Sequence, residues 1–510
     1  MNRFRPELHV TAETGVLEAP AGAVRQGTSL HVFHQFRPTP SSGARWAHQV
    51  SADLPYGWDV CDDVLAPTDG EIDCLAGSSV PVGDGTVELF FVTTAPVGDA
   101  DRDAQLGSAL AHDRRGSRSF TVQRARIRDL DDISDEISDD PSVVRREVER
   151  LGPISVDDSR HRVTALVTPS VIRRDDVWLM VALDLTDDRS ASIVVLTSPD
   201  RQNWTVEGAL EIDGDAGLPD GRPFAPRIVT MEDDTDGRRR DVLFITYPDG
   251  EDRGEEDRGE VAGYIVGRLD GSRFTVETGF QVFDHGHDFT RPRVVQGPRP
   301  LILGLVGTFP GTGKGTWANC LSLPRFLTLT GGHIYQDIVG VPSAVRSYTD
   351  RAAVFTAQLD ATRGAVTVSL LDEADRVTAT VRHSGDRVEF SRTMDDGSED
   401  VRTAVLTDGD SDTLTVLIDG PVCEVFADGG LVSFTSAVSG SSAFSGFRVD
   451  TTAGARVLSA MESLGRRLQR RLAKLDSAKE QERLIAEAAL ADRDLSLIHI
   501  SEPTRLDVIS

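Results

Sequence analysis

The chain has 510 residues, of which 39% are hydrophobic and 27% charged, and its formal net charge at pH 7 is −28. This length allows two or more domains with sizeable cores, while the absence of any apolar run near about 18 residues excludes a membrane-spanning helix. The negative charge argues against nucleic acid and anionic membranes as partners, because both are bound through basic patches.

The first ten residues, Met1 to Val10, contain no apolar stretch of the kind that a secretory signal has, and we therefore expect a cytoplasmic protein. The cysteines Cys61, Cys74, Cys320 and Cys423 are scattered without metal-ligand spacing. We expect them to be reduced and structural. Nothing in the sequence predicts a cofactor.

Residues 1 to about 330 contain many short apolar runs broken by Gly and Asp turns, for example at Val87–Thr94, Val177–Leu185, Asp241–Tyr247 and Leu301–Phe309. Their length and their content of β-branched residues favour strands over helices. Regular spacing of such strands is typical of a sandwich, a barrel or a propeller, and periodicity alone does not choose among these. The chain is therefore predicted to be all-β in this part.

A second β-rich region follows from about 345 to 455. Its runs, such as Ala365–Asp372 and Thr413–Gly420, alternate apolar and polar residues with period two. This alternation indicates sheets with one buried face, as in a β-sandwich.

The last part of the chain differs in composition and in hydrophobic pattern. Met461–Asp494 is highly charged, nearly free of turn residues and has leucines at helical spacing, which predicts a helix with one apolar stripe. That stripe either packs on its own domain or contacts a partner helix. The final segment, Leu495–Ser510, fits neither the composition nor the pattern of the rest, and we interpret it as a non-native tail.

The stretch Gly15–Gly22 (GVLEAPAG), followed by Leu30–Pro38 (LHVFHQFRP), resembles the opening of glycoside hydrolase family 32, the β-fructofuranosidases. In that family a segment close to GW[LM]NDPNG precedes a strand that ends in FYQ. Six further landmarks resemble family motifs in the expected order: Trp46–Trp58, Leu75–Val80, Val266–Phe274, Phe283–Arg293, Thr316–Leu329 and Cys423–Ser436. The resemblance covers about 450 residues. It implies a five-bladed β-propeller over residues 1–335 and a β-sandwich over 336–460, followed by the helix over 461–494.

The chemistry of the family depends on carboxyl groups. Retaining glycoside hydrolysis uses one carboxylate as nucleophile and a second carboxyl as acid and base, about 5–5.5 Å apart. The family also has a third acid, in an RDP motif, that holds sugar hydroxyls. When the residues shared with the family motifs are aligned, Ala19 stands at the nucleophile, Thr168 at the RDP aspartate and Phe224 at the acid/base glutamate. All three acids are therefore predicted to be replaced.

Nearby carboxylates could take over these roles. Glu18 precedes Ala19, but successive side chains of a strand point to opposite faces, so we expect it to point away from the pocket. Asp157, Asp158 and Asp220 lie in segments that precede the other two positions. They remain alternative sources of catalytic carboxylates.

Some positions that line the sugar site in the family retain their residue type. Gln35 matches the Gln of FYQ, Trp46 the Trp of a WGH motif and Ser78 a Ser of an FSGS motif. Gln35 could bind hydroxyl groups and Trp46 could stack on a sugar, or both could be ordinary core and strand residues. His285 and His287 lack a third ligand, so no metal site is predicted.

Three functions remain open. The first is a catalytically inactive family member that binds a small carbohydrate, such as sucrose or another fructoside, or that regulates a partner. The second is an active hydrolase or fructosyl transferase acting on sucrose, sucrose 6-phosphate or fructans with relocated carboxylates. The third is a structural partner of an active paralogue, contacted through the helix at 461–494.

Overall fold

The computed structural model describes residues 5–53, 55–97, 118–130, 147–186, 190–248, 259–307, 317–394, 396–406, 412–438, 443–452 and 454–474. The predicted helix beyond residue 474 and the predicted tail at 495–510 lie outside these residues. The chain divides into two compact units, one of residues 1–339 with 435–437, the other of residues 340–434 with 438–510. Within the described part, no helix is long and apolar enough to cross a membrane.

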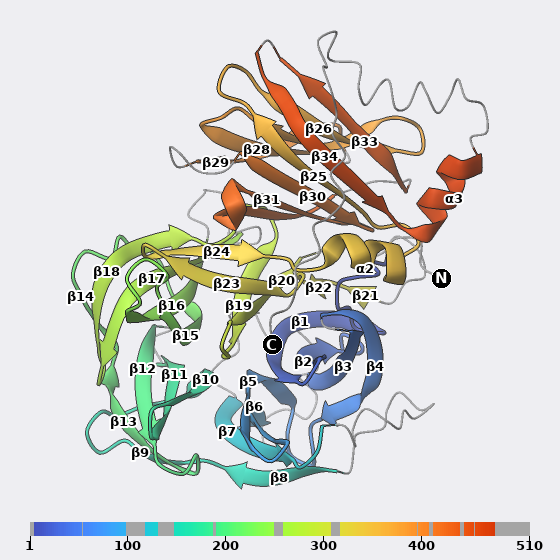
Figure 1. Cartoon of the computed structure of the whole chain (residues 1–510). Coiled ribbons are helices and arrows are strands. Elements are labelled where there is room, and N and C mark those ends of the chain that lie inside the picture. Colours follow the sequence, from blue (N-terminus) through green and yellow to red (C-terminus); the bar gives the residue numbers. More distant parts are fainter. Residues whose placement is uncertain are drawn as a thin grey trace. The chain divides into compact units, whose positions relative to one another are not determined.

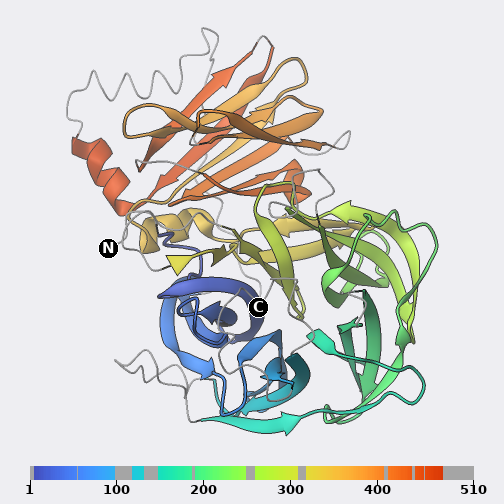
Figure 2. The same ribbon diagram turned by 180° about the vertical axis from the view of Figure 1, so that it is seen from behind.

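The first unit consists of five mainly antiparallel sheets arranged in a ring around a common axis (Figure 1, Figure 2). The first sheet has the order β21-β1-β2-β3-β4 and contains β1 (Gly15–Gln26), β2 (Ser29–Arg37), β3 (Arg45–Asp53), β4 (Tyr56–Leu65) and β21 (Trp317–Ala318). The second has the order β5-β6-β7-β8 and contains β5 (Asp73–Gly83), β6 (Thr86–Pro96), β7 (Arg118–Ile127) and β8 (Val148–Pro153).

The third and fourth sheets each gain an extra edge strand from the segment before them. The third, β10-β11-β12-β13-β9, contains β9 (Ser155–Asp157), β10 (Leu166–Arg174), β11 (Val177–Leu185), β12 (Ala191–Ser198) and β13 (Asn203–Ala209). The fourth, β14-β18-β17-β16-β15, contains β14 (Glu211–Asp213), β15 (Phe224–Glu232), β16 (Arg239–Pro248), β17 (Glu260–Asp270) and β18 (Arg273–Val282). The fifth contains β19 (Phe289–Val295), β20 (Leu301–Val306), β22 (Cys320–Leu321), β23 (Arg325–Thr330) and β24 (His333–Asp337).

Local sequence explains the hairpins that build these sheets. Asp84 and Gly85, the two residues between β5 and β6, have φ values of 50° and 73°. Two positive φ angles define a type I′ turn, whose twist matches that of the strands that it joins, and Asp-Gly is a preferred pair for it. Apolar residues on both faces of the central strands, as in the fully buried β20, then pack sheet against sheet.

The strands β1, β5, β10, β15 and β19 begin the five sheets and lie nearest the axis (Figure 1). The all-β prediction and the propeller with five blades are thereby confirmed. Because all five inner strands border the axis of the propeller, residues from different blades meet at the two ends of this axis.

The second unit is a β-sandwich of two five-stranded sheets, as predicted. One sheet, β32-β31-β30-β25-β34, contains β25 (Ala353–Asp360), β30 (Thr413–Asp419), β31 (Val422–Ala427), β32 (Val432–Ala437) and β34 (Arg456–Leu464). The other, β29-β28-β27-β26-β33, contains β26 (Val366–Asp372), β27 (Val377–His383), β28 (Arg387–Thr393), β29 (Glu399–Val405) and β33 (Phe444–Thr451). Their facing apolar side chains form one core.

The predicted start of the C-terminal helix at Met461 is wrong. Met461 pairs with Thr356 in the edge strand β34, and the helix α3 runs from Arg466 to Lys474 within the described residues. The leucine spacing and charge suggested a helix across this boundary, but pairing with β25 overrides that local preference. A short helix at Val341–Tyr348 (α2) precedes the sandwich and was not predicted.

Candidate functional site

A cavity of about 360 Å³ lies where the inner strands of the propeller begin, and we call it the site cavity. Its walls contain residues from β1, β5, β10, β15 and β19. The polar side chains in its lining are Glu18, Gln35, Thr168, Arg222, Arg227, Arg291 and Asn319. The rest of the lining is mainly apolar, including Leu75, Val167, Leu183 and Phe224. Mostly apolar walls with a few converging polar groups are typical of a small-molecule site.

The three residues predicted to stand at the acid positions of the family all line this one cavity. Ala19 comes from β1, Thr168 from β10 and Phe224 from β15. Three segments that are far apart in the sequence therefore meet where the aligned motifs placed them. None of the three side chains can donate or accept a proton as a carboxyl group does.

The backbone at this end of the inner strands is irregular in every blade. The register of β1 shifts between Leu17 and Ala19, and corresponding shifts occur in the other four inner strands at Leu75/Ser78, Val167/Ser170, Phe224/Arg227 and Thr290/Arg293. Such bulges turn side chains out of the regular alternation and are frequent next to functional sites.

Three residues at these shifts adopt positive φ angles although they are not glycine. The φ values are 52° for Thr168, 42° for Ala225 and 50° for Arg291. Each such conformation costs about 1–3 kcal/mol and persists only where the surrounding structure enforces it. The strained backbone lies in the wall of the site cavity, at Thr168, beside Phe224 and at Arg291.

The expectation that Glu18 points away from the pocket is wrong. Glu18 lines the site cavity, because the bulge between Leu17 and Ala19 breaks the alternation on which that expectation rested. Its side chain is 17% exposed and forms an ion pair with Arg37, with Oε1 3.0 Å from the Arg37 Nε. Among the described lining residues it is the only carboxylate.

The other alternative carboxylates are not in the lining of the site cavity. Asp157 is exposed and belongs to β9, which is the outermost strand of its sheet, four strands away from β10. Asp158 follows it, and Asp220 is exposed in the segment before β15.

The three suggested sugar-contacting residues lie in different places. Gln35 lines the site cavity, where its amide is held by Glu18 and Ala76. Trp46 is fully buried, packs edge-on against Phe91 and donates from Nε1 to the carbonyl of Leu75 at 3.2 Å, so it belongs to the core and not to the cavity wall.

Ser78 lies further along β5 and lines a second cavity at the other end of the inner strands. Its Oγ accepts the backbone N–H of Val171 at 3.0 Å and so links two neighbouring blades. The register shift between Leu75 and Ser78 separates it from the residues of the site cavity.

Sequence reasoning missed the arginines of the site cavity. Arg227 donates from Nη1 to the carbonyl of Thr168 at 2.9 Å, and burial lowers its pKa to about 9. Arg291 pairs with Glu260 through Nε at 3.0 Å and Nη2 at 2.5 Å. Burial raises the pKa of Glu260, but Arg291 and Thr290 outweigh it, so the net pKa lies below the usual range. Arg227 follows Pro226, two residues after Phe224, and Arg291 precedes Pro292 within the motif-like segment Phe283–Arg293; these neighbours were the available signal.

No metal centre emerges from the part of the chain that is described. No group of three or more His, Cys, Asp or Glu side chains in it could hold a metal ion. All four cysteines are buried and none forms a disulfide. The polar groups of the site cavity are mainly hydrogen-bond donors and amides, which suit hydroxyl-rich or anionic ligands.

Comparison with known proteins gives the same family as the motifs. Residues 9–337 match the model of the glycosyl hydrolases family 32 N-terminal domain. The chain is 26% identical to a sucrose-6-phosphate hydrolase of Bacillus subtilis (strain 168) over 360 residues, which are 67% of this chain and 66% of that protein. It is 24% identical over 351 residues to a sucrose-6-phosphate hydrolase of Zymomonas mobilis, covering 65% of this chain and 61% of that one. The chain thus spans less than two thirds of the length of these relatives.

Solved structures show the same fold at low identity. A GH32 beta-fructofuranosidase of Bombyx mori superimposes with a TM-score of 0.69 at 19% identity, covering 92% of this chain and 95% of that one. A sucrose-6-phosphate hydrolase from Lactobacillus gasseri gives a TM-score of 0.68 at 17% identity, with coverage of 91% and 94%. Because the family model spans well over half of its residues, this chain belongs to glycoside hydrolase family 32.

Proposed function

We propose that this protein binds a fructoside in the site cavity without hydrolysing it, as an inactive member of a family of sucrose and fructan metabolism. The observation that carries the proposal is the placement of Ala19, Thr168 and Phe224 in the wall of one cavity. Without carboxyl groups at these three positions the cavity lacks the groups that hydrolyse a glycosidic bond, but it still has room for a ligand.

The energetic argument concerns both catalytic steps. A general acid contributes about 10²–10⁴ to the rate, and nucleophilic catalysis requires a carboxylate within reach of the anomeric carbon. Glu18 is the only described carboxylate in the lining, and hydrolysis with retention needs two. Phe224 adds an apolar surface at the acid position, where it would raise the cost of any charged group.

The remaining groups suit a sugar. Gln35 and Asn319 have amides, and Arg222, Arg227 and Arg291 have guanidinium groups that can donate to hydroxyl oxygens. The ring of Phe224 offers a flat apolar surface for a sugar face. Solved relatives are described as complexes with sucrose, with fructosylnystose and with 1-kestose, which supports a fructoside as the ligand class.

One observation favours a second function. Glu18 reaches the cavity beside the former nucleophile position, so it could act as the nucleophile of a hydrolase whose acid comes from elsewhere. A third role, as partner of a paralogue through the helix predicted at 461–494, has no support from the described residues beyond α3 (Arg466–Lys474).

The test combines turnover and binding on the full chain. Purified protein is incubated with sucrose, sucrose 6-phosphate and inulin, and free fructose is measured against heat-inactivated protein. Binding of the same compounds is measured by calorimetry in the wild type, in Gln35→Ala and in the control Gln358→Ala, which changes an exposed glutamine of β25.

We expect no fructose release, and binding of at least one fructoside that is weakened in Gln35→Ala and unchanged in Gln358→Ala. Fructose release that disappears in Glu18→Gln would instead establish the hydrolase. Absence of both release and binding would remove the fructoside role and leave the partner role.

A further inference from the structure

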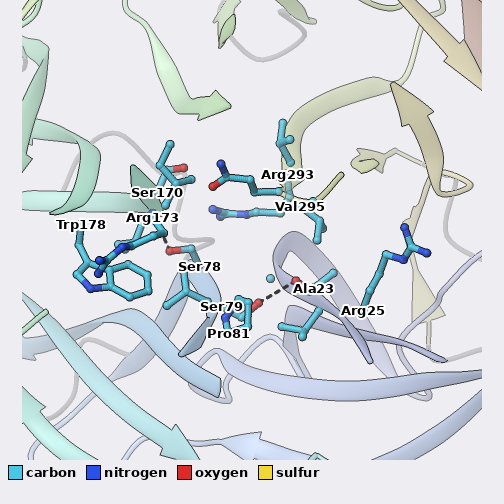
Figure 3. A pocket seen from close by; sticks show the side chains of 18 of the residues that line it. Ala23, Arg25, Ser78, Ser79, Pro81, Ser170, Arg173, Trp178, Arg293 and Val295 are labelled. Carbon is cyan, nitrogen blue, oxygen red and sulfur yellow. Dashed lines mark hydrogen bonds between the residues drawn. The ribbon is translucent and has the colours of Figure 1, made fainter. Parts of the chain in front are cut away.

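A second cavity, of about 610 Å³, lies at the opposite ends of the same inner strands (Figure 3). Segments of β1, β5, β10 and β19 form its walls together with Trp178 of β11. Its described lining contains three arginines, Arg25, Arg173 and Arg293, and no aspartate or glutamate. This is unexpected in a chain with 82 acidic and 54 basic residues. The charge of the cavity is therefore opposite to that of the protein.

Arg293 is the most deeply buried of these arginines, with 2% of its surface exposed. Its Nη2 approaches the carbonyl of Pro20 at 3.4 Å, a long hydrogen bond. Its Nε and Nη1 are buried and have no hydrogen-bond partner among the described residues. Figure 3 shows the side chain reaching from β19 toward Ser78 and Ser170 across the cavity. A buried guanidinium without an acidic partner is costly, and a ligand that accepts hydrogen bonds would remove that cost.

A second buried arginine increases this cost. Arg227 lines the neighbouring site cavity and is 3% exposed, and among the described residues it donates to the backbone carbonyls of Thr168 and Pro226. Burial, and then the nearby charge of Arg227, lower the pKa of Arg293 well below its usual range. Arginine nevertheless stays protonated near neutral pH. Two positive charges therefore lie close together on the propeller axis, with no described carboxylate paired to either.

The other polar side chains of the cavity can also donate hydrogen bonds. The indole Nε1 of Trp178 is buried and has no partner among the described residues. Ser78 and Ser170 contribute hydroxyl groups on the side that Arg293 faces (Figure 3). Arg173 lies at the rim, 46% exposed, with its guanidinium 5.3 Å from the Trp178 ring centre and 4.0 Å from the exposed Asp176. The charged groups of the described lining are thus all cationic donors, and its other polar side chains, serine hydroxyls, the indole of Trp178 and the amide of Gln296, can all donate, which favours a ligand rich in acceptors.

We propose that this second cavity is an anion site that binds a phosphate group, free or on a small phosphorylated metabolite, against the guanidinium of Arg293. Phosphate oxygens accept several charge-assisted hydrogen bonds at once, and the planar guanidinium matches their spacing. The negative charge of phosphate matches a described lining that holds arginines and no carboxylate, and the cavity is large enough for more than the phosphate group. The site is separate from the site cavity, and the proposal does not depend on a fructoside binding there.

Calorimetric titration of the full chain tests the proposal with three probes: inorganic phosphate, fructose 6-phosphate and citrate, at constant ionic strength and pH. Thermal unfolding is followed in parallel, because a ligand that binds only the folded state raises the melting temperature. The variants are Arg293→Met, Arg293→Lys and the control Arg128→Met. Arg128 has a side chain that is 72% exposed, and its substitution changes the net charge equally.

We expect inorganic phosphate, fructose 6-phosphate or both to bind the wild type and the control alike. Loss of the guanidinium group in Arg293→Met should weaken this binding about 10-fold or more, and Arg293→Lys, which keeps the positive charge, should weaken it less. Tighter binding of fructose 6-phosphate than of phosphate identifies a phosphorylated metabolite, and equal binding identifies the free ion.

Three results would overturn the proposal. They are no binding of either phosphate probe to the wild type, binding of citrate alone, and a phosphate response that persists in Arg293→Met, which would indicate a general salt effect. If Arg293→Met does not fold, the titration of the wild type and the comparison with Arg293→Lys decide the question.

Discussion

Gln35 holds two walls of the site cavity together through a single amide. Its Nε2 donates to Glu18 Oε2 at 2.5 Å, and its Oε1 accepts the backbone N–H of Ala76 at 2.5 Å. Glu18 is in turn paired with Arg37, which also contacts Asp73 at 2.9 Å. Glu18, the one carboxylate among the described lining residues, therefore has a structural role, because it links Gln35 and Arg37.

Glu18→Gln should lower the free energy of unfolding of the propeller by about 1–3 kcal/mol, because the partly buried Arg37 loses one of its charged partners. The measurement is urea unfolding followed by tryptophan fluorescence, which reports on the first unit because all five tryptophans lie in it. The control is Glu149→Gln, which breaks an exposed ion pair with Arg128 and should cost at most about 1 kcal/mol. Equal losses in both variants would argue against a structural role for Glu18.

Restoring the acids should restore chemistry. The triple variant Ala19→Asp, Thr168→Asp, Phe224→Glu places carboxyl groups at three positions in one wall, on a backbone that keeps its bulges. We expect it to release fructose from sucrose where the wild type does not. Omitting Phe224→Glu should reduce the rate about 10²–10⁴-fold, because the general acid is then missing. If the triple variant folds and binds fructosides but releases no fructose, the cavity does not correspond to the catalytic site of active family members.

The bulge of β5 depends on a glycine. A Cβ at Gly77 would lie 1.8 Å from the carbonyl oxygen of Phe90, a backbone atom that cannot move aside. We expect Gly77→Ala to lower the free energy of unfolding by more than about 3 kcal/mol, or to prevent folding. Gly446→Ala is the matched control, because a Cβ there meets nothing within 4 Å. Similar stabilities of the two variants, measured by thermal unfolding, would show that the strand relaxes at Gly77.

Acid should destabilise the propeller through His34. This residue of β2 is fully buried beside Phe36, and burial lowers its pKa to about 3. The unfolded chain binds a proton at His34 below its ordinary pKa of about 6.5, but the folded chain does not do so until about pH 3. Its contribution to stability is therefore complete above pH 6.5 and is lost by about 1.4 kcal/mol per pH unit as the pH falls toward 3.

The measurement is urea unfolding between pH 7 and pH 4 in the wild type and in His34→Gln. The variant cannot bind this proton. Its free energy of unfolding should therefore decline less steeply, by about 1.4 kcal/mol per pH unit below pH 6.5. Parallel declines in the two proteins would assign the acid sensitivity to the carboxylates instead.

The sequence by itself determined the family and the two β-rich regions, and it predicts the three positions at which the acids of the family are replaced. Motif frames fixed by glycine and proline locate Ala19, Thr168 and Phe224, and the structure brings these residues into one cavity. Such frames survive because turns, bulges and close strand contacts require particular residues wherever the fold is kept.

Only the tertiary structure decided where the neighbouring side chains point. The bulge in β1 turns Glu18 toward the cavity, the packing against Phe91 buries Trp46, and pairing with β25 makes Met461 part of a strand. The cluster of Arg227 and Arg293 is likewise invisible along the chain, because it forms only where strands of different blades meet at the propeller axis. Alternation and helical spacing describe isolated elements, whereas burial and charge depend on contacts between residues far apart in sequence.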